Sequence, residues 1–368
     1  MFKLTKTQGN ARIGKLKTAH GEIETPFFMP VATKGATKNL SFDDLHATGT
    51  NAIISNAFLL SLKPGLEIIN QFGGLHKFIN WNKVIFTDSG GFQILSPNFI
   101  IKIDDGGVTF RSPFDGAKIF LKPEDAIQIE NSLGSDVAMC LDDVPHMHKT
   151  RHQVEDSVKR TTLWAERCLA AHKNKKQLLF CINQGGIFND LREKSINSLL
   201  EFKFDGMALG GLSIGEEKKH MLETIEHCNK LIPEKLPRYL MGVGSPIEII
   251  ESIDRGIDIF DSCFLTRMGR HGQVFSLTGK FDISLAKFSK ERNPLDKECK
   301  CFVCKQFSKA YLHHLIRTNE PTVLHYISFH NVFFVQNLIK ESKQAIKEQN
   351  FDKFKNNFVK KYSSNNSY

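Results

Sequence analysis

One stretch of the chain, Val84-Ile-Phe-Thr-Asp-Ser-Gly-Gly-Phe-Gln93, joins a short apolar run to a polar, glycine-containing end. The apolar residues do not alternate with polar ones, which is typical of a strand buried on both faces of a parallel sheet. Beyond the strand, glycines let backbone N–H groups approach a ligand closely, Phe92 can stack on a planar ring, and Gln93 can form hydrogen bonds. The stretch therefore predicts a buried strand whose end holds a nucleobase-like ligand or makes only a tight strand-to-helix turn.

Short apolar runs of the same kind recur along the chain, with helical or turn-rich segments between them. The eight runs are residues 27–31, 52–54, 84–86, 137–141, 178–182, 207–209, 239–241 and 257–260. Two intervening segments, 123–132 and 153–172, have helical character. The apolar stripe of the second comprises Val154, Val158, Leu163, Trp164 and Cys168. Eight alternations of strand and helix predict an α/β protein folded as a (β/α)8 TIM barrel.

Polar and glycine residues follow seven of these runs. They are Ser55-Asn56, Asp88, Asp142-Asp143, 183–186, Gly210-Gly211, 242–244 and Asp261. In a barrel all of these positions meet at the carboxyl ends of the strands, which is where barrel enzymes carry their chemistry. We therefore expect carboxylates and amides from separate strands to converge on one site.

Two segments interrupt the alternation of strands and helices. Residues from about 98 to 122 contain turn sequences typical of β-hairpins, which predicts a β insertion in a catalytic barrel of residues 1–275. Residues 276–346 form the expected metal-binding subdomain and closing helix, and that helix is predicted from residue 331 to about 346. The Lys/Asn/Ser-rich end, 347–368, is expected to be a flexible tail.

The composition of the 368 residues, with 41% hydrophobic and 24% charged side chains, is that of an ordinary soluble globular protein. The net charge of +9 permits a polyanionic partner, although the excess of lysine over arginine is also consistent with coding bias. No run approaches the length of a membrane span, and the N-terminus lacks a signal-peptide core. Five of the eight cysteines are scattered through apolar segments, which favours a reducing, cytoplasmic location.

The other three cysteines form a cluster with the spacing of a metal site. Cys299, Cys301 and Cys304 supply three thiolates, and His330 follows them along the chain. Three cysteines and one histidine make the closed ligand set of a structural zinc site, with no position left for a catalytic water. We therefore predict one structural Zn²⁺ per chain. His330 is the favoured fourth ligand, and its competitors are His325 and the pair His313 and His314.

Three aspartates, Asp88, Asp142 and Asp261, are the candidates for reactive groups. Two carboxylates that flank one bond suit glycosidic chemistry, in which one is the nucleophile and the other is the general acid/base. Asp261 is followed by Arg267 and Arg270. A carboxylate near two arginines is either a structural ion pair or an ionised nucleophile whose arginines bind phosphate, and the spacing does not choose between them.

Six motifs occur in an order that resembles one enzyme family. They are residues 87–93, 136–142, Gln184-Gly185, 208–212 with Gly215-Glu216, 238–244, and the cysteine cluster with 310–315. Together they resemble the tRNA-guanine transglycosylases, the queuine tRNA-ribosyltransferase family, from about residue 11 to about residue 346. The resemblance implies a pentosyltransferase of queuosine biosynthesis. Such an enzyme replaces the wobble guanine of tRNAs with a G-U-N anticodon by a 7-deazaguanine base, and it works as a homodimer.

The resemblance also implies roles for individual residues. Asp261 matches the nucleophile, which forms a covalent tRNA–aspartate intermediate in a double displacement, and Asp88 matches the general acid/base. The base flips into the barrel mouth, where Phe92 and Met241 sandwich it. The remaining matches are the base-recognition groups Asp142, Gln184, Gly211 and Leu212, the anticodon-loop contacts Arg267 and Arg270, and the zinc ligands Cys299, Cys301, Cys304 and His330.

The chain departs from the family pattern at several positions. Residues 56–60 read Asn-Ala-Phe-Leu-Leu where Asn-Thr-Tyr-His-Leu is usual, and Leu265 replaces a proline beside the nucleophile. Ile214 stands where enzymes that accept queuine tend to have glycine, which favours 7-aminomethyl-7-deazaguanine, whereas Val144 points weakly toward queuine. The alternative function is a catalytically silent, zinc-containing tRNA-binding subunit, and the presence of both Asp88 and Asp261 argues against it.

Overall fold

The computed structural model describes residues 1–90, 100–145 and 149–363, and within them eight parallel strands form one sheet. The strands, in sheet order, are β4 (Phe27–Pro30), β14 (Ile259–Ser262), β13 (Arg238–Leu240), β12 (Gly206–Leu209), β11 (Leu178–Asn183), β10 (Val137–Met139), β6 (Val84–Asp88) and β5 (Ala52–Asn56). A parallel bridge between Val31 and Ile54 joins the two outer strands, and the N–H of Ala32 donates to the Ile54 carbonyl at 2.7 Å. The sheet is thus nearly closed, and the predicted (β/α)8 barrel is confirmed.

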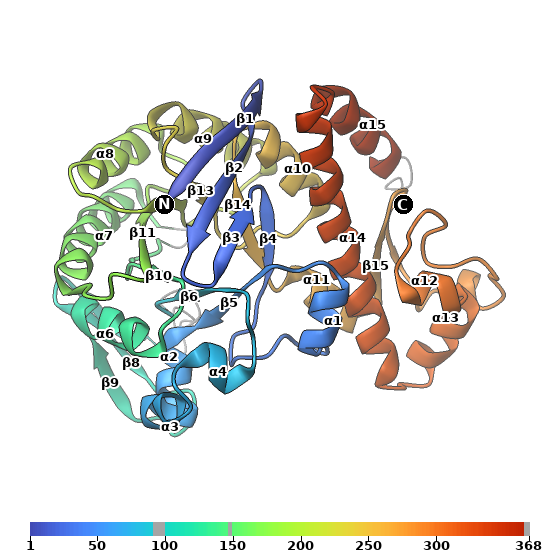
Figure 1. Cartoon of the computed structure of the whole chain (residues 1–368), viewed down its shortest axis with the longest axis horizontal. Coiled ribbons are helices and arrows are strands. Elements are labelled where there is room, and N and C mark those ends of the chain that lie inside the picture. Colours follow the sequence, from blue (N-terminus) through green and yellow to red (C-terminus); the bar gives the residue numbers. More distant parts are fainter. Residues whose placement is uncertain (91–99, 146–148, 364–368) are drawn as a thin grey trace.

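Helices surround the sheet on its outer side (Figure 1). They are α1 (Phe42–Ala47), α2 (Ala57–Leu60), the π-helical turn η1 (Ser61–Gly65), α3 (Leu66–Gln71), α4 (Leu75–Ile79), α6 (Pro123–Leu133), α7 (Arg151–Ala171), α8 (Asn189–Leu200), α9 (Lys218–Leu231), α10 (Pro246–Asp254) and α11 (Phe264–Arg270). The two helices predicted from the sequence correspond to α6 and α7. The predicted stripe of α7 is wrong at Leu163, which is 39% exposed, because the buried face runs through Thr161 and Ala165 instead.

An antiparallel sheet of β1 (Phe2–Gln8), β2 (Ala11–Thr18) and β3 (Gly21–Glu24) closes the N-terminal end of the barrel. Phe2, Leu16 and Ile23 of this sheet belong to the same buried cluster as Phe86 and Phe180 in the barrel interior. A ligand therefore reaches the interior from the carboxyl end of the strands.

The predicted β insertion is an antiparallel sheet of β7 (Ile100–Asp104), β8 (Gly107–Arg111) and β9 (Lys118–Leu121). It docks on α7, because Trp164 Nε1 and Arg167 Nη1 donate to the carbonyl of Asp105 at 3.0 and 2.7 Å.

The C-terminal part packs beside the barrel, with α14 running along it (Figure 1). Its elements are β15 (Gln273–Ser276), β16 (Gly279–Asp282), the 3₁₀ helix η2 (Ala286–Phe288), α12 (Phe302–Gln306), α13 (Lys309–Arg317), α14 (Thr322–Lys347) and α15 (Phe351–Ser363). The expected flexible tail is instead a helix over 351–363. Phe351, Phe358 and Tyr362 are buried, and Lys355 pairs with Asp254 of α10 at 2.6 Å, so apolar anchors in the lysine-rich segment order it.

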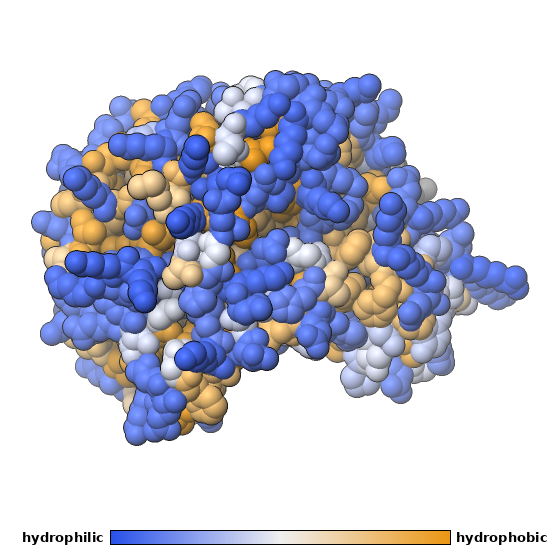
Figure 2. Space-filling view, in the orientation of Figure 1, coloured by the Kyte–Doolittle hydropathy of each residue, from blue (hydrophilic) through white to orange (hydrophobic). Residues whose placement is uncertain are grey.

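The face of the molecule that carries β1–β3 is mostly hydrophilic (Figure 2). Within the described ranges, no helix has the length and apolarity needed to cross a membrane.

Candidate active site

Asp88, Asp142 and Asp261 meet at the carboxyl end of the barrel. Asp88 ends β6, Asp261 lies in β14, and Asp142 follows β10. The three carboxyl groups are close enough to interact, since the charges of Asp261 and Asp142 both raise the pKa of Asp88. The predicted convergence of carboxylates on this end of the barrel is therefore present.

Asp261 is held through one of its two oxygens. Its Oδ1 accepts hydrogen bonds from Tyr239 Oη at 2.6 Å and from the N–H of Gly242 at 2.9 Å. Burial raises the pKa of Asp261, and these two hydrogen bonds oppose the shift because they stabilise the anion. No arginine pairs with it among the described residues, so the structural ion pair that the sequence left open is not what the structure shows. Oδ2 accepts no hydrogen bond among the described residues.

Asp88 lies in an environment that favours its protonated form. Burial raises its pKa to about 8, with a further contribution from the charge of Asp261, while the Gly90 N–H that it accepts at 2.9 Å opposes the shift. Asn56 is directly opposite Asp88 in the β5–β6 register. A carboxyl group that keeps a proton at neutral pH can serve as a general acid.

The contacts of positions 56 and 90 explain why an asparagine and a glycine occur there. Asn56 Oδ1 caps α2 by accepting the N–H of Leu59 at 2.7 Å, while its Nδ2 has no partner among the described residues. A Cβ at Gly90, where φ is +82°, would lie 2.8 Å from the Cβ of Phe58. Gly90 is therefore required by the tight turn after β6, which is one of the two interpretations that the sequence predicted for this stretch, the other being a ligand-binding strand end.

Asp142 and Gln184 form a second polar pair at this end of the barrel. Gln184 Nε2 donates to Asp142 Oδ2 at 2.7 Å, and Gln184 Oε1 has no partner among the described residues although the side chain is fully buried. Burial raises the pKa of Asp142 to about 7. A Cβ at Gly210 or Gly211 would lie 2.5 Å from the Gln184 amide, so these glycines let the backbone come close to it. Such a pair offers acceptors to a planar ligand that carries N–H donors.

The loop after β12 lies beside the pair of Asp142 and Gln184. The Glu216 carboxylate accepts the N–H groups of Ser213 and Ile214, the latter at 3.0 Å, and so fixes the loop that carries Ile214. Leu212 is buried, and Val144 lies 3.7 Å from the position of a Cβ on Gly211. Ile214 and Val144, the two residues from which the sequence analysis predicted substrate preference, therefore both lie near the glycine pair.

Other predicted site residues have simpler positions. Met241 follows β13, immediately before the Gly242 that binds Asp261. Arg267 and Arg270 are on α11, with Arg267 exposed. Phe92 lies outside the described residues. Asp143, next to Asp142 in the sequence, pairs with Arg160 of α7.

The structure brings Cys299, Cys301, Cys304 and His330 together. Their ligand atoms lie within 4.8 Å of one another, and the three sulfurs are 3.7, 3.5 and 3.3 Å from His330 Nδ1. His330 Nε2 donates to the carbonyl of Phe275 at 2.7 Å, which leaves Nδ1 facing the thiols. The competing His325 instead contacts Asp44 at 3.0 Å. Three thiols and one imidazole at these distances are consistent with one zinc ion.

Comparisons with known proteins identify the family of the chain. The family model described as Queuine tRNA-ribosyltransferase matches residues 7–364. The chain belongs to this family. It is 46% identical over 367 residues to a queuine tRNA-ribosyltransferase of Dehalococcoides mccartyi (strain CBDB1), covering 99% of this chain and 94% of the relative. It is 44% identical to those of Fusobacterium nucleatum subsp. nucleatum, covering 98% of both chains, and of Bacillus subtilis (strain 168), covering 97% and 94%.

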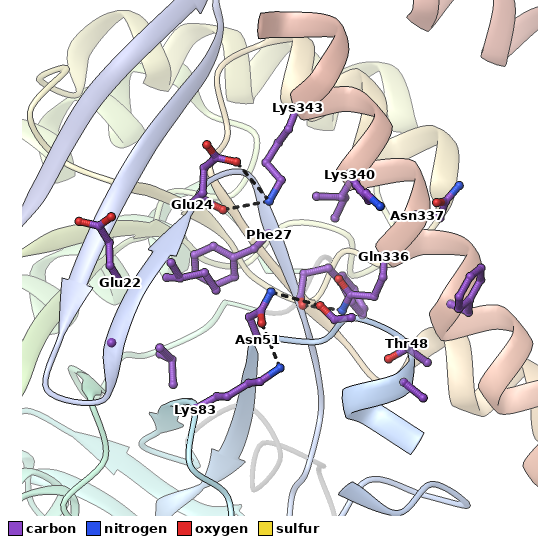
Figure 3. Close-up of a pocket in the computed structure, with 18 of the residues that line it drawn as sticks. Glu22, Glu24, Phe27, Thr48, Asn51, Lys83, Gln336, Asn337, Lys340 and Lys343 are labelled. Atoms are coloured by element: carbon purple, nitrogen blue, oxygen red, sulfur yellow. Dashed lines mark hydrogen bonds and ion pairs between the residues drawn. The ribbon is translucent and has the colours of Figure 1, made fainter. Parts of the chain in front are cut away.

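Away from the three aspartates, this family member has a cavity of about 510 Å³ near β3 and α14. Figure 3 shows the residues that line it. Its polar side chains largely satisfy one another: Lys83 Nζ is 3.1 Å from Asn51 Oδ1, and Lys343 is 3.8 Å from Glu24. His20, at its edge, stacks on His76, and both donate to Asp136 at 3.0 Å. These contacts support the closed end of the barrel.

The sequence did not single out Tyr239 as a site residue. Tyr239 is fully buried in the barrel interior and reaches Asp261 across the sheet. The only available signal was a hydroxyl-bearing aromatic residue inside an otherwise apolar strand, because buried tyrosine hydroxyls usually find a partner.

Proposed function

We propose that this protein exchanges the wobble guanine of tRNAs with a G-U-N anticodon for a 7-deazaguanine base, by double displacement. The observation that carries the proposal is the difference between the two facing carboxyl groups. Asp261 has one oxygen fixed by two donors and the other open, whereas the pKa of Asp88 is raised to about 8. One carboxyl group that keeps a proton at neutral pH, and a second that is fixed through one oxygen by two hydrogen-bond donors, suit acid/base and nucleophilic catalysis of glycosidic cleavage.

The steps follow from this arrangement. Asp261 Oδ2 attacks the anomeric carbon of the wobble ribose, the bond from that carbon to guanine breaks, and the leaving base takes the proton of Asp88. Asp88, now ionised, removes a proton from the ring nitrogen of the incoming 7-deazaguanine. That nitrogen then attacks the same carbon and displaces Asp261, so the product keeps the original configuration.

Recognition of the base is assigned to Asp142, Gln184 and the backbone at Gly211 and Leu212, with Phe92 and Met241 against the ring. The open acceptors of the Asp142–Gln184 pair suit the N–H groups of guanine. Ile214, fixed by Glu216, favours 7-aminomethyl-7-deazaguanine over the bulkier queuine. We expect Ile214→Gly to raise queuine incorporation relative to the smaller base, and an unchanged ratio would contradict this role.

Binding of tRNA is assigned to Arg267 and Arg270, which follow the nucleophile on α11. A groove of about 1320 Å³ beside Phe264 is lined by lysines such as Lys218 and Lys280 and by carboxylates such as Asp282 and Glu291, and we assign phosphate contacts to its lysines. None of the eight cysteines forms a disulfide, which suits the reducing cytoplasm.

Exposed Tyr311, which packs on Phe307 near the cysteine cluster, offers an apolar surface for a homodimer. Sedimentation would measure the oligomeric state.

Zinc is proposed as a structural ion. Cys299, Cys301, Cys304 and His330 would supply its four ligands, and because His330 belongs to α14, the ion would fasten α12 to that helix. We expect one zinc per chain by elemental analysis, and loss of both zinc and thermal stability in Cys304→Ser.

The decisive experiment measures incorporation of labelled guanine into an unmodified G-U-N tRNA by the wild type and by Asp261→Asn. We expect exchange by the wild type, none by the variant, and an RNA–protein adduct that survives denaturation only with the wild type. A folded, zinc-loaded wild type that binds tRNA without exchange would favour the silent tRNA-binding subunit instead. Exchange by Asp261→Asn would exclude Asp261 as the nucleophile.

A further inference from the structure

Arg192 of α8 is a fully buried arginine beside the base-recognition groups, and its side chain binds only amide oxygens among the described residues. Nη1 donates to the carbonyl of Asn183 at 2.8 Å and to its side-chain Oδ1 at 3.1 Å. Nε donates to the carbonyl of Gly186 at 2.8 Å, and Nη2 to that of Gly210 at 2.8 Å. One guanidinium therefore joins the end of β11 to the end of β12.

The residues on either side of Gln184, Asn183 and Gly185, both pack against Arg192. A Cβ at Gly185, where φ is +153°, would lie 2.8 Å from the backbone nitrogen of Arg192 and 3.1 Å from its Cδ. Asn183 returns a hydrogen bond, because its Nδ2 donates to the carbonyl of Arg192 at 3.0 Å. The motif that carries Gln184 is thus folded around the arginine.

Two of the three backbone carbonyls that Arg192 binds, those of Asn183 and Gly210, belong to peptide units that lead into the base-recognition residues Gln184 and Gly211. A trans peptide unit is planar, and its C=O and N–H point in opposite directions. Fixing the carbonyl of Gly210 therefore fixes the direction of the Gly211 N–H. In the same way, the bond to the Asn183 carbonyl orients the backbone of Gln184, whose N–H is 3.4 Å from Ser195 Oγ.

We propose that Arg192 is a positioning residue that sets the base-recognition edge formed by the Gln184 side chain and the Gly211 backbone. The proposal rests on the proposed function, since the ligand is guanine or a 7-deazaguanine. Arginine suits this role because its planar fork holds several acceptors at fixed angles, which the single ammonium of lysine does not reproduce. Pre-organised donors bind a ligand without the cost of ordering them at each binding event.

The test is steady-state exchange of labelled guanine at saturating tRNA by Arg192→Lys. We expect the KM for guanine to rise about tenfold, kcat to fall less than about threefold, and the Kd for tRNA to stay within about twofold, since phosphate contacts dominate RNA affinity. The matched control is Arg12→Lys at the opposite end of the barrel. Arg12 is also a buried arginine that binds backbone carbonyls, those of Glu234 at 3.1 Å and Leu236 at 2.7 Å. This control should lower the Tm and leave the KM unchanged.

An unchanged KM in folded Arg192→Lys would overturn the proposal, as would equal rises in both variants. If Arg192→Lys does not fold, Asn183→Ala removes one acceptor of the same array. It should raise the KM about threefold, and no rise would also overturn the proposal. If the wild type exchanges no guanine, the proposed function fails separately. Calorimetric binding of free guanine to the wild type and Arg192→Lys then decides the role of Arg192.

Discussion

Asp258 and Asp261 lie at opposite ends of β14 in very different surroundings. Asp258 is fully buried, pairs with Arg12, and also accepts the backbone N–H of Arg238 at 2.7 Å. Asp261 accepts only neutral donors, Tyr239 and a backbone N–H, and no cation of the described residues pairs with it. The first charge is compensated by an arginine inside the protein, and the second has no such partner.

The same contrast exists around β10. Burial alone would raise the pKa of Asp136, but hydrogen bonds from His76, the Ile85 N–H and His20 more than offset it and lower the pKa to about 2. Asp142, beyond the other end of the strand, has a pKa raised to about 7 by burial. Asp136 and Asp258, at the N-terminal end of the barrel, therefore have partners that stabilise their charge, whereas Asp142 and Asp261, at the carboxyl end, have no cationic partner among the described residues.

The largest expected difference is between substitutions of the two aspartates on β14. Asp258→Asn leaves Arg12 buried without its counter-charge and should lower the free energy of unfolding by about 3–5 kcal/mol. Asp261→Asn should not lower that free energy, but should reduce guanine exchange by at least about a thousandfold. Denaturant unfolding and exchange assays on both variants check this. Equal destabilisation by the two substitutions would contradict the claim that Asp258 stabilises the fold and Asp261 does not.

The ionisation of Asp88 and that of Asp142 should affect activity with opposite signs as pH changes. Asp88 must hold a proton to release guanine, so the rate of adduct formation should fall as pH rises through about 8, by about tenfold per unit beyond it. Asp142 must be ionised to accept N–H groups of the base, so the KM for free guanine should rise as pH falls below about 7. Single-turnover and steady-state measurements between pH 5.5 and about 9 separate the two effects. A rate of adduct formation that is flat above pH 8 would exclude Asp88 as the acid.

The smallest effect concerns the stability cost of Asp88. Its pKa is raised to about 8 in the folded protein, against about 3.9 in an unfolded chain, so the unfolded state loses its proton first as pH rises. Stability attributable to this group therefore falls between about pH 4 and pH 8. Asp88→Asn removes the titration and should raise stability by about 1–2 kcal/mol at pH 8 and by less at pH 5. Thermal unfolding at both pH values measures this, and a variant less stable than the wild type at pH 8 would contradict it.

The fold was predictable because its signals are local. Eight non-alternating apolar runs locate the barrel strands, and the cysteine spacing identifies the ligands that meet at His330. The tail was predicted wrongly because lysine content hid the buried face formed by Phe351, Phe358 and Tyr362, which only packing against α10 and α14 reveals.

The sequence by itself determined the alternation of elements, the residue types at each strand end and the family, since these depend on order along one chain. The tertiary structure decided which aspartates are compensated and which are not. That distinction depends on residues far away in sequence, such as Arg12 for Asp258 and Tyr239 for Asp261. It also decided that Arg192 holds two strand ends at once. Electrostatic surroundings and shared hydrogen-bond donors are properties of neighbours in space, so the order of residues does not specify them locally.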